Sequence, residues 1–205
     1  MVEKSEQIVR DPQGRFLAIS CTLHGRPTLI VAAHADNNSD AEQEAFYKRL
    51  AQALEHFRPD KKPGMDYHFL MDTNNAPDWH LDYRSTASRT TQSRPLGIAA
   101  MQQLAQTFKV IDNFRELNPS RREYTRTHHL SGGHESQKRL DRSFSSAHMH
   151  RKGRGRARPA ITRAAHIWPD QTDRAALKGE GSNSKWSDHA TIELTVRFTL
   201  WFWTQ

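Results

Sequence analysis

Three short stretches of the chain carry the residue types that acid–base chemistry on a phosphoester would need. They are Met71-Asp72-Thr73-Asn74, Arg139-Leu140-Asp141-Arg142 and Ser187-Asp188-His189. Each stretch lies at the end of a predicted β-strand or in the loop beside it. Because a strand end is a rigid mount, groups from distant parts of the chain can be aimed at one point there. A single aspartate at a strand end usually caps or turns the chain, but three such stretches together favour a shared site.

Together these stretches contain the groups that hydrolysis of a phosphodiester requires. Such hydrolysis needs a positioned water, a group that accepts its proton, and stabilisation of the developing oxyanion, which a divalent metal ion usually supplies. Asp72, Asp141 and Asp188 could supply the hard carboxylate oxygens that Mg²⁺ or Mn²⁺ prefers. Asn74 could orient the water or the phosphate, and His189 could accept a proton. These five side chains are therefore the predicted catalytic and metal-binding groups.

Hydrophobic patterning predicts two adjoining strands near the N-terminus. Residues 15–24 alternate between apolar and polar types, which predicts a half-buried strand with Leu17 and Cys21 on its buried face. Residues 28–33 form a continuous apolar run, which is typical of a strand buried on both faces. The Gly-Arg-Pro connection between the two runs predicts a hairpin, and a polar loop that begins at His34 follows its second strand.

Further patterns predict two helices and several more strands. Asp40 and Gln43 suit a helix N-cap and its N3 partner, and they precede an amphipathic segment with apolar residues three and four positions apart. Residues 123–128 and 138–146 are predicted to pair as an antiparallel hairpin that carries Asp141. The other predicted elements are a second helix over 95–108, strands over 67–71, 161–167 and 191–198, a short extended piece at 110–111, a helical turn over 114–117 and a loop over 79–94.

The composition indicates one basic domain. A chain of 205 residues is long enough for one buried core, which we place at residues 1–198, followed by an apolar tail over 199–205. The formal net charge of +7 and the pI of about 9.8 fit either an anionic partner such as nucleic acid or ordinary basicity. The densest basic stretch, residues 150–158, is either a solvated loop or an arm that contacts phosphate.

Cysteine content and hydropathy exclude some classes of site and partner. With Cys21 as the single cysteine, the chain can form neither an internal disulfide nor a cluster of thiolate metal ligands. This fits an intracellular location, in the nucleus or the cytoplasm. No apolar run approaches the roughly 20 residues of a membrane span, and the first residues lack the apolar segment of a signal peptide. We expect nucleic acid, namely DNA, as the partner because of the net charge, with no membrane and no obligate protein partner.

Five short motifs follow one another in an order that a known family shares. They are Gly14-Arg15-Phe16-Leu17 leading to Ala33-His34-Ala35, then Phe69-Leu70-Met71-Asp72-Thr73-Asn74, then Arg115-Glu116-Leu117-Asn118-Pro119 with Tyr124-Thr125, then Arg139-Leu140-Asp141-Arg142, and finally Ser187-Asp188-His189. In this order they resemble the motifs of the endonuclease/exonuclease/phosphatase superfamily, and within it those of the endonuclease domains of LINE-type retrotransposons. Each motif is short, but the series covers nearly the whole chain.

The resemblance implies a fold, a reaction and a set of roles. The implied fold is of the α/β class (α+β type), a DNase I-like two-layer β-sandwich flanked by helices, and the implied reaction is hydrolysis of a DNA phosphodiester with Mg²⁺ or Mn²⁺. Asp72 and Asn74 would hold the attacking water and the phosphate. Asp141 would orient His189 toward the phosphate, and Asp188 would help to bind the metal. Substrate-binding residues implied in the same way are His34, which stands where the family usually has Tyr, Thr127 and Arg139.

The chain also departs from the family pattern. The family begins with two further strands, one of which carries a metal-binding Glu, and residues 1–11 are too few to supply them. We therefore expect an N-terminally truncated domain without its first strands, with weakened metal binding and weak or absent activity. A phosphatase of the same superfamily and a non-catalytic remnant that binds nucleic acid through its basic loops are the alternatives.

Overall fold

The structure is a computed structural model that describes residues 2–86, 94–150, 161–167 and 191–196. The predicted tail, the basic stretch from residue 151 onward, and the predicted site residues Asp188 and His189 lie outside these ranges. The strands are β1 (Val2–Arg10), β2 (Phe16–Leu23), β3 (Arg26–His34), β4 (Asp66–Asp72), β5 (Tyr83–Ser85), β6 (Val110–Asp112), β7 (Arg126–His129), β8 (Glu135–Lys138), β9 (Asp141–Ser146), β10 (Ile161–Ile167) and β11 (Thr191–Val196). The α-helices are α1 (Asp40–Ala53), α2 (Trp79–Asp82), α3 (Pro95–Phe108) and α4 (Asn113–Leu117).

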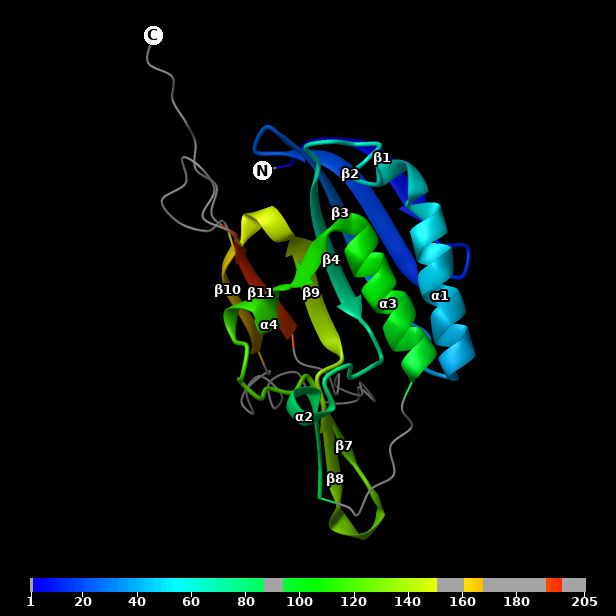
Figure 1. The fold of residues 1–205 in the computed structure, drawn as a ribbon, viewed down its shortest axis with the longest axis vertical. Helices are drawn as coiled ribbons and strands as arrows, with labels where there is room; N and C mark the ends of the chain where they lie inside the picture. The colour runs from blue at the N-terminus through cyan, green and yellow to red at the C-terminus, as the bar shows by residue number, and fades with distance from the viewer. Residues whose placement is uncertain (1, 87–93, 151–160, 168–190, 197–205) are drawn as a thin grey trace, which may run out of the picture.

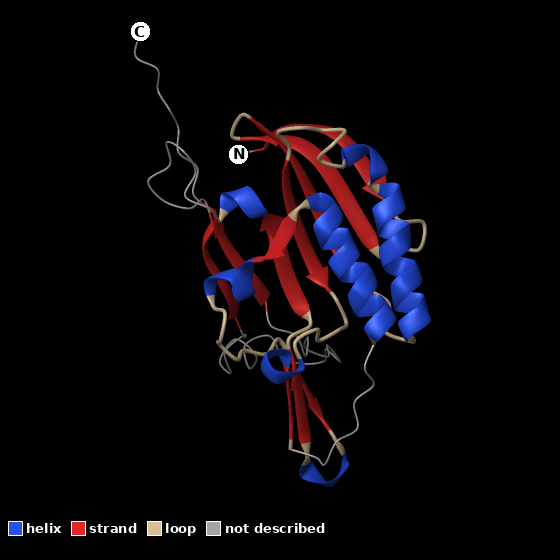
Figure 2. Cartoon of the chain, in the orientation of Figure 1, coloured by secondary structure: helices blue, strands red, loops and turns tan. Residues whose placement is uncertain are grey.

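A six-stranded sheet in the order β1-β2-β3-β4-β9-β6 forms the centre of the molecule. β3 and β4 run parallel, with α1 in the connection between them, and the other neighbouring pairs are antiparallel. The helices α1 and α3 lie side by side over one face of this sheet (Figure 1). This arrangement confirms the predicted mixed class of strands and helices (Figure 2).

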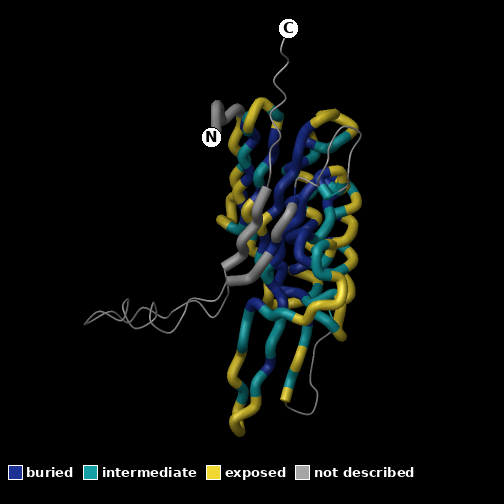
Figure 3. The backbone as a smooth tube through the Cα atoms, turned by 90° about the vertical axis from the view of Figure 1, so that its left-hand side faces the viewer, coloured by how far each residue is buried: buried dark blue, intermediate teal, exposed yellow. Residues whose placement is uncertain are grey.

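Two smaller sheets flank the central one. The two-stranded sheet β10-β11 contacts α4 and β9. The three-stranded sheet β5-β8-β7 projects from the end of the molecule at which β4 ends (Figure 1). Buried residues gather between the central sheet and the helices, whereas the projecting sheet is mostly intermediate or exposed (Figure 3). No helix in the described ranges is long and apolar enough to cross a membrane.

The core between the sheet and the helices confirms the predicted helix faces. Helix α1 buries Phe46, Tyr47 and Leu50, and α3 buries Met101, Leu104 and Phe108. From the sheet, Phe16, Ala18, Leu29, Val31, Phe69 and Met71 join the same cluster.

The buried face of β2 differs from the predicted one. Phe16 and Ala18 point into the core, while Leu17 is 39% exposed on the opposite face. β3 is also covered on one face only, since Val31 is buried and Ala32 is exposed. The reason is that the helix layer covers one face of this half of the sheet, whereas β10-β11 lies at the other half, against β9. Cys21 is buried, as predicted.

Three local predictions are wrong in their detail. Ser39, rather than Asp40, caps α1, because its Oγ accepts the N–H of Glu42 at 3.1 Å and donates to the Glu42 carboxylate at 2.8 Å. The predicted loop over 79–94 begins with α2 and β5. The partner of β7 is β8 rather than residues 138–146, since β9 instead joins the central sheet between β4 and β6. Residues 2–10, for which no element was predicted, form β1.

Replacing Gly97 by Ala is expected to destabilise the fold, although Gly→Ala in an exposed helix stabilises by about 1 kcal/mol. A Cβ at position 97 would lie 2.1 Å from Gln43 Oε1. Gln43 cannot move aside cheaply, because it is fully buried and its amide nitrogen donates to the carbonyl oxygens of Asp36, Thr73 and Asn74. Overpacking of this kind costs about 1–3 kcal/mol, which urea unfolding would measure. In a Gln43→Ala background the penalty should shrink, and a Gly97→Ala protein more stable than the wild type would contradict the argument.

Candidate active site

Strand register brings two of the predicted carboxylates together. β4 ends at Asp72 and β9 begins at Asp141, and the antiparallel pairing of the two strands sets these residues directly opposite each other. Opposed residues point to the same face, with Cβ atoms about 5 Å apart. Both side chains are partly exposed. Two acidic groups that are 69 positions apart in the chain therefore form one accessible pair.

His34 extends this pair into a row of three residues. β3 runs parallel to β4, and His34, its last residue, lies beside Asp72. His34 Nε2 is 3.5 Å from Asp72 Oδ2, and the imidazole is largely exposed. The row His34–Asp72–Asp141 thus presents an imidazole and two carboxylates across three adjacent strands at one edge. Such a row can exchange a proton with water and can offer oxygen ligands to a hard cation.

Asn74 is held beside the row in a strained conformation. Its φ is +47°, in the left-handed region that Asn tolerates better than most residues. Its backbone N–H donates to Asp72 Oδ1 at 3.0 Å, and its side-chain amide donates to the carbonyl oxygen of Ala35 at 2.9 Å. These bonds fix both the Asp72 carboxylate and the Asn74 side chain. The structure therefore brings His34, Asp72, Asn74 and Asp141 together.

Two buried side chains of α1 hold the loop that contains Asn74. Gln43 donates to the carbonyl oxygens of Thr73 and Asn74, at 3.3 and 3.2 Å. Tyr47 donates to the Thr73 carbonyl oxygen at 3.0 Å. Burial raises the pKa of the Tyr47 hydroxyl, so it remains a donor at all ordinary pH values. The sequence showed Gln43 as a cap residue and Tyr47 as part of an apolar face, so this positioning role was missed.

Thr125 holds the other side of the row. Its buried Oγ1 accepts the backbone N–H groups of Leu140 and Asp141, at 2.9 and 3.0 Å. Thr73 Oγ1 donates to the carbonyl oxygen of Leu140 at 2.7 Å, which ties the β4 loop to the start of β9. Thr125 lies in the Tyr-Thr motif, but nothing in its local pattern indicates which backbone groups it would bind.

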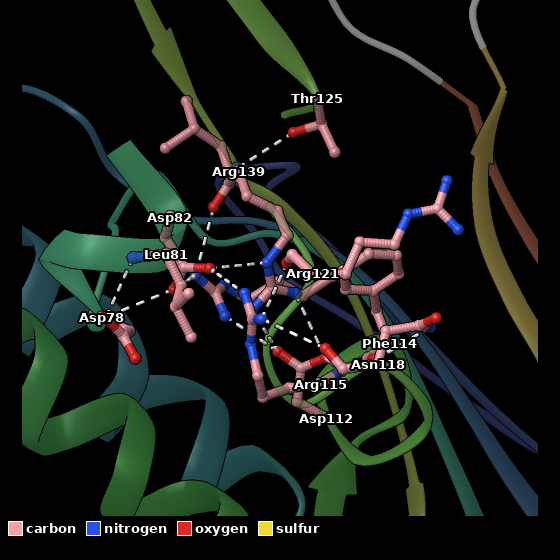
Figure 4. A network of polar contacts seen from close by, with 12 residues as sticks. Asp78, Leu81, Asp82, Asp112, Phe114, Arg115, Asn118, Arg121, Thr125 and Arg139 are labelled. Carbon is pink, nitrogen blue, oxygen red and sulfur yellow. Dashed lines mark hydrogen bonds and ion pairs between the residues drawn. The ribbon is translucent and has the colours of Figure 1, made fainter. Parts of the chain in front are cut away.

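A buried network of charges joins the residues at the start of β9 to neighbouring elements (Figure 4). Asp82 Oδ1 accepts from Arg139 and Arg115, at 2.8 and 2.7 Å, and Asp82 Oδ2 accepts from Arg142 at 2.8 Å. Asp112 accepts from Arg139 and Arg142, each at 2.8 Å. Three guanidinium groups and two carboxylates thereby join α2, β6, α4 and β9.

Two predicted substrate-binding residues do not join the row. The Arg139 side chain is 1% exposed and both ends of its guanidinium are bonded to aspartates, so the structure gives it a supporting position instead of a surface one. Its charge is needed to balance Asp82 and Asp112. Thr127 lies in β7, paired with Gln137 on the projecting sheet.

Asp188 and His189, the remaining predicted residues, lie outside the described ranges. β11 starts two residues after His189, and it contacts β9, whose first residue is Asp141. Among the described residues, no three or more His, Cys, Asp and Glu side chains form a cluster that could hold a metal ion.

Stability is expected to fall as the pH drops below the ordinary aspartate pKa of 3.8. Burial alone would raise the pKa of Asp82 and of Asp112, but the charges of Arg142 and Arg139 outweigh it and hold both pKa values below the ordinary one. Below about pH 4 the unfolded chain therefore binds protons at these carboxylates that the folded chain does not bind. The contribution of the two groups to the free energy of unfolding is complete above about pH 4 and is lost progressively below it. Urea unfolding at pH 7, 5, 4 and 3 measures the effect. An Asp82→Asn protein should show a shallower loss below pH 4, and equal slopes would refute the assignment.

No protein-family model matches the chain, and no curated protein matches it. Among solved structures, the endonuclease domain of TRAS1, a telomere-specific non-LTR retrotransposon, superposes with a TM-score of 0.56 at 13% identity, over 95% of this chain and 70% of that one. The 3′ phosphatase NExo from Neisseria, bound to a product DNA hairpin, superposes with a TM-score of 0.60 at 15% identity, over 95% of this chain and 72% of that one. The AP endonuclease LMAP from Leishmania major superposes with a TM-score of 0.61 at 14% identity, over 92% of this chain and 56% of that one.

Similarity at these identities concerns the backbone. The superpositions cover between 92% and 95% of this chain. The architecture of the structure therefore agrees with the fold that the order of the five motifs implied: the chain has a DNase I-like fold.

Proposed function

We propose that the chain hydrolyses phosphodiester bonds of DNA with the help of a divalent metal ion. The observation that carries the proposal is the cross-strand pair Asp72–Asp141, with His34 and Asn74 beside it. Hydrolysis of a phosphodiester requires a base for the attacking water and groups that orient the phosphate. The row offers both at one accessible edge.

Each residue of the row has a proposed role. Asp72, fixed by the Asn74 N–H, would orient the attacking water, and Asn74 would stay close to the phosphate. Asp141 would orient His189 through a carboxylate–imidazole hydrogen bond, which sets the tautomer of the imidazole. His189 would then contact the phosphate or take part in proton transfer. His34, at the exposed end of the row, would contact the substrate.

The donor chemistry of the row fits Mg²⁺ or Mn²⁺. Asp72 and Asp141 present hard carboxylate oxygens, and Mg²⁺ is usually held by one or two carboxylates together with oxygens of the substrate phosphate. Asp188 would supply a further carboxylate. A bound ion would polarise the phosphate and stabilise the leaving oxyanion.

DNA is the proposed substrate for two reasons. The similar structures include an AP endonuclease and a phosphatase crystallised with a DNA product, each on the same fold. The chain also carries a formal charge of +7, which attracts a polyanion.

Nicking of supercoiled plasmid tests this proposal. The full chain should convert supercoiled plasmid to open circles in Mg²⁺ or Mn²⁺, at a rate lowered by the weakened metal binding expected from the sequence, and should fail to do so in EDTA. His189→Ala should abolish the nicking. Hydrolysis of a small phosphoester without nicking would favour the phosphatase alternative. Salt-sensitive DNA binding that survives Asp72→Ala with Asp188→Ala, and is accompanied by no nicking, would favour the non-catalytic alternative.

A further inference from the structure

A stacked pair of aromatic rings lies at the projecting end of the molecule, outside the row His34–Asp72–Asp141. Trp79, the first residue of α2, and Tyr83, the first residue of β5, have ring centroids 3.8 Å apart and planes 25° from parallel. Trp79 is nevertheless 36% exposed. A large indole that is stacked on one ring and open to solvent offers a flat surface to a further ring.

Cations lie beside this aromatic pair. Strand register sets Tyr83 opposite Lys138 and Lys138 opposite Arg126, so the three side chains form one row on one face of the β5-β8-β7 sheet. Lys138 Nζ lies 5.9 Å from the centroid of the Tyr83 ring, within the range of a cation–π interaction. Burial lowers the pKa of Lys138, and the charges of Arg94 and Arg126 lower it further. The ammonium group therefore lies in a positive field, in which a phosphate would be attracted.

The aromatic pair is mounted rigidly. Asp78 caps α2, since its Oδ1 accepts the N–H groups of His80 and Leu81 at 3.0 Å, which directs the Asp78 carboxylate toward the helix backbone. Asp82, between the two rings in sequence, is anchored in the buried charge network (Figure 4). A platform held in this way needs no reordering when a ligand binds, which favours affinity.

One cation beside the aromatic pair lies close to the row along the chain. Lys138 precedes Asp141 by three residues, which span at most about 10 Å. A strand whose phosphate sits at Asp72 and Asp141 could thus reach Lys138, which lies beside the Tyr83 ring of the aromatic pair.

We propose that Trp79 and Tyr83, with Lys138 and Arg126 beside them, form a platform that stacks an unpaired base of DNA near the scissile phosphate. An unpaired base exposes its ring face, whereas a base within a duplex is covered by its neighbours. The choice of DNA rests on the proposed function, but stacking itself requires no hydrolysis.

Fluorescence anisotropy of a labelled 12-nucleotide single strand, with the full chain in EDTA, tests the platform. Trp79→Ala should weaken binding about 5- to 160-fold, which corresponds to the free energy that stacking of one base on an aromatic side chain contributes. Trp79→Phe should retain most of the affinity. Leu96→Ala, which removes a side chain 48% exposed on α3, is the matched control and should bind like the wild type. Circular dichroism melts verify that each variant is folded.

Two further ligands make the test specific for an unpaired base. Trp79→Ala should have little effect on a strand of the same length built from abasic residues, and a smaller effect on a blunt duplex than on the single strand. Equal losses on all three ligands, or single-strand binding within twofold of the wild type, would overturn the platform.

Crosslinking tests the same contact without a variant. A single strand with 5-iodouracil should crosslink to Trp79 or Tyr83 of the wild-type chain, as mapped by mass spectrometry, and crosslinks confined to other residues would overturn the proposal. If DNA affinity depends on Trp79 but the chain nicks no plasmid, the proposed function is wrong and the platform is supported. If the chain nicks plasmid but its DNA affinity does not depend on Trp79, the platform is wrong and the proposed function is supported.

Discussion

An Asp141→Asn protein is expected to nick plasmid DNA about 10²- to 10⁴-fold more slowly than the wild type while remaining folded. This range is the usual contribution of a positioned acid–base group. Asn retains the size of Asp and can still accept hydrogen bonds, so the pairing of β9 with β4 should persist. What is lost is the negative charge that would orient His189 and contribute to the acidic row. The nicking rate at saturating Mg²⁺ and the urea midpoint are the two measurements.

Matched variants separate chemistry from positioning. Asp72→Asn should cause a loss of similar size, because Asp72 is the other member of the pair. Asp60→Asn, at an exposed carboxylate paired with Arg58, should leave the nicking rate unchanged. Thr125→Val should lower the rate less than Asp141→Asn, since Thr125 acts only through the backbone of residues 140 and 141. Wild-type nicking by Asp141→Asn would show that the carboxylate pair is not the reactive centre.

Much of the scaffold was predictable because it depends on local patterns. The helix over 95–108 was predicted with the bounds that the structure shows, from a proline at its first position and apolar residues three and four apart. Strands over 67–71 and 28–33 were predicted from short apolar runs, and in the structure they end one residue later, at Asp72 and His34. Because Asp72 and Asp141 each lie at a strand end, the expectation that they meet needed only the correct pairing of β4 with β9.

The pairing of β4 with β9 could not be predicted from the sequence. Residues 138–146 looked like the partner of the preceding strand, because hairpins between neighbouring strands are common, but β9 instead joins a strand 69 residues earlier. The buried face of β2 was also mispredicted, because its two faces are both largely apolar or small. Alternation cannot choose a face in such a strand; the layer that packs against it does so.

The supporting residues were missed for a related reason. Gln43, Tyr47 and Thr125 bind backbone groups of loops that are distant in sequence, so their own neighbours show no sign of the role. Asp82 lay in a stretch predicted as loop, and its three arginine partners come from later segments. Buried charges of this kind are recognisable only when their partners are known.

Asp82→Ala is expected to destabilise the fold by about 3–5 kcal/mol, because removing one partner of a buried ion pair leaves the others uncompensated. Asp82 is 1% exposed, and its two oxygens serve three guanidinium groups. Without it, Arg139 and Arg142, both almost fully buried, would share the single carboxylate of Asp112. Their mutual repulsion would act on the segment that leads into Asp141. Urea unfolding followed by circular dichroism at pH 7 gives the free energy of unfolding.

The comparison that decides the cause is between Asp82→Ala and Asp82→Asn. Asn keeps the shape and one accepting oxygen but places an NH2 donor where the other oxygen accepts from a guanidinium. A loss that stems from packing would therefore largely disappear in Asp82→Asn, whereas a loss that stems from charge and hydrogen-bond acceptance would remain. We expect the second result, because three positive groups surround the site. Asp60→Ala, at an exposed ion pair, should change stability far less. Arg139 and Leu140 lie directly before Asp141 in the chain, so the network holds the segment that carries this residue. If Asp82→Ala were as stable as the wild type, the network would not be needed to stabilise that segment.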